Sequence, residues 1–106
     1  MEKKEMEVFS QAINLGIVRM PGRKFPGSVI QGDSLRYLLA LAEEIEKRTK
    51  DSTDEELIDT LGELKELLSE RLVHYEEILK EHSIELPYDG VVSEAGSENR
   101  AEASRV

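Results

Sequence analysis

The chain has 106 residues, no cysteine and a formal net charge of −9 at pH 7. That length corresponds to one ordinary domain with enough apolar surface for a single core. The lack of cysteine excludes disulfides, thiolate metal sites and cysteine nucleophiles, and it suits a reducing cytosol. The first nine residues lack the apolar run of a signal peptide and no membrane-spanning stretch follows, so we expect a cytoplasmic location and no membrane partner.

The negative charge is concentrated in one segment. Residues 51–82 carry eleven acidic and three basic side chains, whereas residues 1–30 carry three acidic and five basic ones. An acidic surface repels phosphate groups, so we expect no nucleic acid partner, while a basic protein partner would be attracted. The alternative is that the acidic segment is a solvated helix that only aids solubility.

The first third of the chain predicts short strands. Polar and apolar residues alternate over residues 4–9, and residues 16–20 and 28–31 are short apolar runs bounded by glycine or proline. These patterns are typical of strands joined by turns. Two Pro-Gly pairs, at residues 21–22 and 26–27, each fit the central positions of a type II turn, where glycine takes a positive φ. We expect a small antiparallel sheet of two or three strands.

The remainder of the chain predicts two helices. Apolar residues recur every three and four positions over about residues 34–48 and, after a break, over about residues 54–82, which is the period of an amphipathic helix. We expect Asp33 and Thr53 to be the two N-caps, because a short polar side chain there accepts hydrogen bonds from first-turn amides.

These elements predict an α+β fold. Residues 1–88 would form a single domain, with the small sheet followed by a helical hairpin, and residues 89–106 would be a disordered tail because they are rich in Gly, Ser, Ala and Glu. The longer helix has more apolar surface than the shorter one can cover, which leaves the sheet or a second copy of the chain to cover the rest. A homodimer is a possible outcome through near-heptad positions that Arg71 interrupts; these are Leu57, Leu61, Leu64, Leu68, Tyr75 and Ile78.

Residues 32–35, Gly-Asp-Ser-Leu, match the signature of the GDSL esterases and lipases, in which the serine is the nucleophile. That chemistry also needs a histidine to accept the serine proton, and the resemblance implies an Asp three residues before it. Arg71 stands three residues before His74, and Leu79 stands three residues before His82. We therefore expect no catalytic residue and no enzyme activity, and we interpret the motif as a helix start.

The histidines also raise the question of a metal site. Glu70, Glu77 and Glu81 lie within helical reach of His74, so a carboxylate-histidine site is conceivable. A di-iron bundle, however, needs Glu-x-x-His motifs, and none is present. The chain also has no glycine-rich phosphate loop and no calcium-loop pattern. We expect no metal and no cofactor.

Residues 21–27, Pro-Gly-Arg-Lys-Phe-Pro-Gly, form the strongest candidate for a binding site. A stiff loop there would present three cations, Arg19, Arg23 and Lys24, beside the aromatic Phe25 at little ordering cost. Such a loop suits an acidic or phosphate-bearing partner. In the alternative interpretation Phe25 folds onto the core and the cations meet the acidic helix.

The runs VRMPGRKFPGSVIQGDSL, residues 18–35, and HYEEILKEHSIELPY, residues 74–88, resemble a small bacterial family of unknown function. The resemblance covers nearly everything up to Tyr88 and implies a compact bacterial cytosolic protein, without supplying an activity. Our leading hypothesis is a non-catalytic protein-binding domain, one form of which is an immunity protein that neutralises a basic toxin. The alternative is a small-ligand or anion-binding regulatory domain that uses the 21–27 loop.

Overall fold

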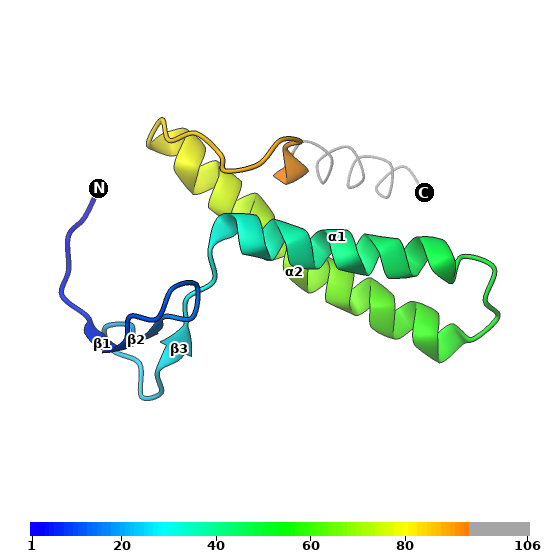
Figure 1. The fold of residues 1–106 in the computed structure, drawn as a ribbon, viewed down its shortest axis with the longest axis horizontal. Helices are drawn as coiled ribbons and strands as arrows, with labels where there is room; N and C mark the ends of the chain where they lie inside the picture. The colour runs from blue at the N-terminus through cyan, green and yellow to red at the C-terminus, as the bar shows by residue number, and fades with distance from the viewer. Residues whose placement is uncertain (94–106) are drawn as a thin grey trace. The chain divides into compact units, whose positions relative to one another are not determined.

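The structure is a computed structural model and describes residues 1–93. The chain forms two compact units, residues 1–31 and the residues from Gly32 onward, and each is described by itself. The α+β class is confirmed, because three strands are followed by two helices (Figure 1). In chain order the elements are β1 (Glu7–Ser10), β2 (Ile17–Arg19), β3 (Gly27–Ser28), α1 (Gly32–Arg48) and α2 (Glu55–Glu81).

The strands form one antiparallel sheet in the order β1-β2-β3. Val18 at the centre of β2 lies opposite Val8 on one side and Gly27 on the other, and the register shifts between Val8 and Ser10. The link from β1 to β2 turns through Asn14, which has a positive φ of 61°. Asparagine adopts this left-handed conformation more readily than most residues. The small antiparallel sheet predicted from the sequence is therefore present, with strands shorter than expected.

Only the first of the two predicted type II turns is present. Gly22 has a φ of 79°, and the amide of Arg23 donates to the carbonyl of Met20 at 3.1 Å, as such a turn requires. The second prediction is wrong, because Gly27 has no positive φ and belongs to β3. Pairing with Val18 of β2 holds Gly27 in an extended conformation, so the second Pro-Gly pair begins a strand.

Residues 1–31 contain no buried side chain. Apolar residues are nevertheless frequent there, and Val8, Phe9 and Phe25 are all at least half exposed. A sheet this small is marginally stable unless its apolar surface is covered. This unit is therefore held by its strand ladder and by polar contacts rather than by a core of its own.

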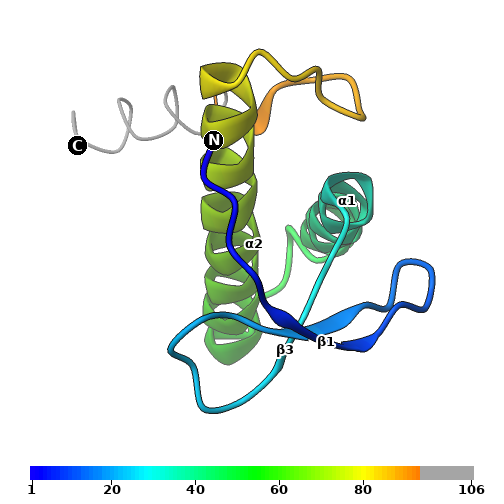
Figure 2. The ribbon, with the colours of Figure 1, turned by 90° about the vertical axis from the view of Figure 1, so that its left-hand side faces the viewer.

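The second unit is a hairpin of α1 and α2, which pack together while the last turns of α2 extend past the start of α1 (Figures 1 and 2). Gly32 at the start of α1 allows a close approach, because a Cβ there would lie 2.2 Å from the ring of Tyr75. Leu72 of α2 has no exposed surface. The core cluster around it consists of Leu35, Leu39, Leu72, Val73 and Val92, with Leu68 and Tyr88 packed against it.

Neither predicted N-cap, Asp33 nor Thr53, is the residue that directly precedes its helix. The N-cap of α2 is Asp54, whose carboxylate accepts a hydrogen bond from the amide of Leu57 at 3.1 Å. The amide of Asp54 in turn donates to the hydroxyl of Ser52, which positions the cap. Helix α1 already includes Gly32, so Asp33 lies in its first turn, where a negative charge is favourable.

After α2 the chain reverses at Ser83, which has a φ of 55°, and residues 84–93 return alongside the helix (Figure 2). We call residues 84–93 the strap. The predicted disorder is wrong for residues 89–93, because Val92 is buried in the core and donates a backbone hydrogen bond to α2. The rest of the predicted tail, residues 94–106, lies outside the described residues. Within residues 1–93, neither helix has the length and apolarity that a membrane span needs.

Candidate functional site

The structure gives Arg19 an internal role. Its guanidinium donates to the carboxylate of Glu7 and to the carbonyl of Lys24, both at 3.0 Å, and lies 5.1 Å from the centre of the Phe9 ring. These contacts tie the 21–27 loop and β1 to β2. Arg19 therefore already has an acidic and a carbonyl partner within residues 1–31.

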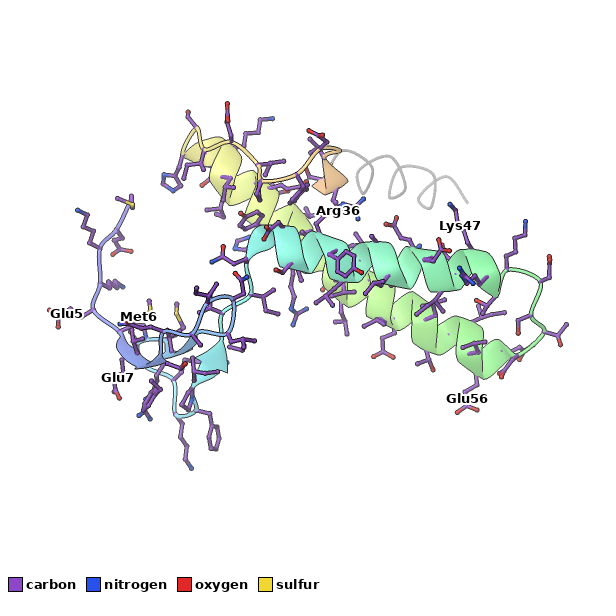
Figure 3. All side chains as sticks on the ribbon, in the orientation of Figure 1. Glu5, Met6, Glu7, Arg36, Lys47 and Glu56 are labelled. Carbon is purple, nitrogen blue, oxygen red and sulfur yellow. The ribbon has the colours of Figure 1, made fainter. Side chains whose placement is uncertain are left out.

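The other loop residues are more accessible. Phe25 is 75% exposed, and residues 1–31 contain no buried side chain on which it could pack. The ammonium of Lys24 lies 5.3 Å from the centre of the Phe25 ring. The Arg23 side chain makes no ion pair with the described residues. A hollow of about 290 Å³ beside the turn is lined partly by Arg19 and Arg23. Two acidic residues before and within β1, Glu5 and Glu7, also line it and would oppose an anion (Figure 3).

The residues of the Gly-Asp-Ser-Leu motif lie in the first turn of α1. The amide of Ser34 donates to the carboxylate of Asp33 at 2.8 Å, and Leu35 belongs to the core. Among the described residues, no group of three or more acidic or histidine side chains is arranged to hold a metal ion. The expectation that the protein is not an enzyme stays a prediction.

Within residues 1–93, the buried charged side chain is Glu76 of α2, which is 3% exposed. Its carboxylate accepts hydrogen bonds from the hydroxyl of Tyr88, the amide of Val92 and the amide of Ser93, at 2.5, 2.9 and 2.5 Å. All three donors belong to the strap. Glu76 therefore fastens the strap to α2, and we call these four residues the Glu76 clasp.

The clasp changes the acidity of both of its side chains. Burial raises the pKa of the Glu76 carboxyl, whereas the hydrogen bonds from Tyr88, Ser93 and Val92 lower it. Together the hydrogen bonds have the larger effect, so the pKa lies below its ordinary value of 4.5. Burial and the Glu76 carboxylate raise the pKa of Tyr88 well above its ordinary value of 10.0. At neutral pH the clasp thus joins an ionised carboxylate to a protonated phenol.

The hairpin also carries apolar side chains that its own packing leaves partly exposed. Each helix has a stripe of leucine and isoleucine side chains that are 36–46% exposed. We call the two stripes together the open face, and it consists of Leu38, Leu41 and Ile45 on α1 with Leu57, Leu64, Leu67 and Ile78 on α2.

The two stripes lie on the same side of the hairpin. On α1, Leu38 and Leu41 each come one residue before a buried residue. On α2, Leu64 and Leu67 likewise come one residue before side chains that face α1, namely Lys65 and Leu68. One residue corresponds to about 100° of rotation around a helix. Because the helices are antiparallel, the same rotation away from their contact line turns both stripes to one side.

This arrangement divides the predicted homodimer positions between two surfaces. Leu61, Leu68 and Tyr75 face into the hairpin, where they contribute to its packing. The remaining three, Leu57, Leu64 and Ile78, belong to the open face. A seam that uses all six positions at once is therefore not available for a partner.

Four exposed carboxylates run beside the α2 stripe. They are spaced seven residues apart, close to two helical turns, so they follow one edge of the helix. We call them the glutamate strip, which consists of Glu56, Glu63, Glu70 and Glu77. Figure 3 shows the first of them, Glu56, pointing away from α1. None of the four forms an ion pair with the described residues.

Sequence reasoning missed the clasp, and of the open face it identified only the α2 residues Leu57, Leu64 and Ile78. Nothing marks Glu76 among the neighbouring acidic residues, because its donors Val92 and Ser93 come from a segment whose composition indicated disorder. The pair Glu56-Leu57 recurs seven residues later as Glu63-Leu64, and this repeat is visible in the sequence. It indicates that α2 has a second apolar face, bordered by glutamates, besides the face that packs on α1.

No curated protein and no solved structure matches the chain. One family model matches it, over the sheet, both helices and the strap as far as Tyr88, which donates to Glu76. The match spans residues 1–88 and agrees with the extent of the resemblance described above. The chain therefore belongs to DUF6959, a family of unknown function.

Proposed function

We propose that the protein is a non-catalytic protein-binding domain and that the open face of its hairpin receives a basic protein. The observation that carries this proposal is the open face itself, in which seven aliphatic side chains of two packed helices stay partly exposed on one side. Contiguous apolar patches of this kind mark interaction surfaces more often than scattered apolar residues do.

The charge around the open face supports a basic partner. Helix α2 carries nine acidic and three basic residues, and the glutamate strip borders its apolar stripe. Complementary charge speeds the encounter of two proteins and excludes partners of like charge. A toxin-neutralising role in a bacterial cytoplasm is one form of this proposal, supported by the small size, the acidity and the lack of cysteine.

Exposed cations on the 21–27 loop support a second candidate, an anion-binding regulatory domain. Arg23 and Lys24 are exposed, which favours it. The engagement of Arg19 by Glu7 and the presence of Glu5 at the same hollow weaken it. Thermal unfolding in the presence of phosphate, sulfate and nucleotides tests this candidate, which predicts a rise in Tm that is lost when Arg23 and Lys24 are both replaced by alanine.

The main proposal is tested by capturing partners from the native organism with three forms of the full chain. Leu64→Glu places a charge in the open face, whereas Ile58→Glu is a matched control on α2, since Ile58 is 48% exposed but lies outside the two stripes. We expect the wild type and Ile58→Glu to retain one stoichiometric basic protein and Leu64→Glu to lose it. Far-UV circular dichroism checks that both variants are folded.

Capture of the same protein by all three forms would show that the protein binds at a surface other than the open face. Capture of no protein by the wild type would contradict the proposal as a whole. If the captured protein is toxic when expressed alone, co-expression with the wild type and with Leu64→Glu tests the neutralising role directly.

A further inference from the structure

We propose that the element bound by the open face is an amphipathic helix that carries Lys or Arg every seven residues, and that these cations pair with the glutamate strip. This inference rests on the proposed function and specifies the partner's chemistry. The open face provides the apolar contact, and the strip provides the charge complementarity that selects the partner.

The spacing of α2 favours a helical partner. Leu57, Leu64 and Ile78 recur at multiples of seven residues, and each directly follows a member of the glutamate strip. Two helices that share a seven-residue apolar repeat stay in contact along their whole length, and the charged positions beside that repeat decide which helices pair. A third helix laid on the open face would contact α1 and α2 together, as amphipathic helices do in other helix-binding proteins.

The glutamate strip is available for such pairing. Elsewhere in the described part of the hairpin, carboxylates beside cations form ion pairs, as Glu46 does with Lys65 at 2.7 Å and Glu44 with Arg48 at 3.0 Å. The four strip residues are exposed and have no such cation. Their charges are uncompensated beside an apolar surface, and a basic helix would compensate them on binding.

The same strip disfavours a second copy of this chain as the occupant. If two α2 helices packed antiparallel through their open faces, the same edge of each helix would meet. Glu63 and Glu70 of one copy would then oppose the glutamates of the other, and like charges at such positions act against pairing. The strip thus disfavours self-association through the open face, while it favours a cationic helix.

Arg71 sets the register of the proposed complex. It occupies the same position of the seven-residue repeat as the aliphatic residues Leu57, Leu64 and Ile78. Its side chain is exposed. Its guanidinium donates to the carbonyl of Leu67 in its own helix at 3.0 Å and forms no ion pair with the described residues. We expect an acidic residue of the partner helix to lie opposite it.

The test uses two synthetic helical peptides with the same leucine repeat, one with lysine and the other with glutamate at the flanking positions. Each is titrated into the full chain at low salt. An exposed pair contributes about a factor of two, so four pairs predict that the lysine peptide binds at least about tenfold more tightly than the glutamate peptide. Raising the salt concentration should reduce that preference, because exposed pairs are screened.

A pair of charge-reversed variants makes the test specific. Glu63→Lys combined with Glu70→Lys should abolish or reverse the preference for the lysine peptide. Glu5→Lys combined with Glu85→Lys changes the net charge equally but lies outside α2, and it should keep the preference. Loss of the preference in both variants would show an effect of net charge alone and overturn the inference.

Three further outcomes would also overturn it. Equal binding of both peptides would remove the role of the glutamate strip but leave the proposed function to the capture experiment. The absence of binding by either peptide would exclude a helix of this kind, again without deciding whether a protein binds the open face. A dimeric mass in light scattering that Leu64→Glu makes monomeric would assign the open face to a second copy.

Discussion

Residues 1–31 hold three strands and no buried side chain, whereas the hairpin unit encloses a core in which Leu72 has no exposed surface. The strands are held by ladder hydrogen bonds and by the contacts of Arg19. The hairpin adds side-chain packing and the Glu76 clasp. Two neighbouring units of one chain thus depend on different interactions, and mutations in them should have effects of different size.

The two units also differ in how well exposed apolar side chains indicate a binding surface. In residues 1–31 nearly every apolar side chain is exposed, so exposure alone singles out no site there. In the hairpin most helix positions have a clear role in the core, in the clasp or in solvated polar surface. The open face has none of these roles, and for that reason its exposed leucines are informative about binding.

The largest expected effect is in the hairpin core. Leu72→Ala should reduce the free energy of unfolding by about 2–5 kcal/mol, because it leaves a cavity where a fully buried side chain was packed. The matched change in the sheet, Val8→Ala, should reduce it by less than about 1 kcal/mol, since Val8 is half exposed. Urea unfolding followed by circular dichroism measures both. Equal losses would contradict the difference between the two units.

The next effect concerns the Glu76 clasp. Glu76→Gln introduces an amide that cannot accept all the hydrogen bonds of the strap, so at pH 7 we expect a loss of about 1–3 kcal/mol. Hydrogen exchange should locate that loss, with faster exchange at the amides of Val92 and Ser93. Glu77→Gln, next in sequence but exposed, is the control and should leave both amides protected.

The clasp also predicts a pH dependence. The pKa of Glu76 is lowered in the folded chain, so its stabilising contribution is fully present above the unfolded-state value of 4.5 and is lost as the pH falls below it. The stability difference between wild type and Glu76→Gln should therefore be largest near neutral pH and should shrink below pH 4.5. A difference that stays constant to pH 3, about one unit or more below that value, would show that the carboxylate charge does not hold the strap.

The sequence predicted the order of elements well because local patterns determine it. Alternation over residues 4–9 and the three-and-four period after Asp33 indicated the strands and helices of the structure. The Glu76 clasp depends on residues twelve to seventeen positions apart, and composition alone classed residues 89–93 as disordered. Contacts made across a chain reversal leave no local pattern.

The candidate site shows the same limit. The sequence identified the cations of the 21–27 loop, but it could not show that Glu7 and Phe9 of a neighbouring strand engage Arg19. It also grouped Leu61 and Leu64 in one seam, although only the packing of α1 decides which side of α2 is covered. Periodicity identifies an apolar stripe, and the partner that covers part of it appears only in the folded structure.

A smaller effect is expected from two glycines. Gly32→Ala would push a Cβ into the ring of Tyr75, so the ring or α1 must shift, with a loss of about 1–2 kcal/mol. Gly62→Ala meets no atom within 4 Å in the middle of α2 and should instead stabilise the chain by about 0.5–1 kcal/mol. Opposite shifts in the urea midpoint are expected. A gain from both changes would mean that the start of α1 is not packed on Tyr75.

The smallest effect is expected in the sheet, at the ion pair of Arg19 and Glu7. A double-mutant cycle with Arg19→Gln and Glu7→Gln should give a coupling energy of about 0.2–1 kcal/mol, because the pair is partly exposed. Arg19→Gln should speed hydrogen exchange in the ladder of β1 and β2 while the amides of α2 keep their protection, since the hairpin core does not depend on this contact. If the amides of α2 exchanged faster by the same factor, the two units would be unfolding together, and the hairpin core would not be stabilised independently of the sheet.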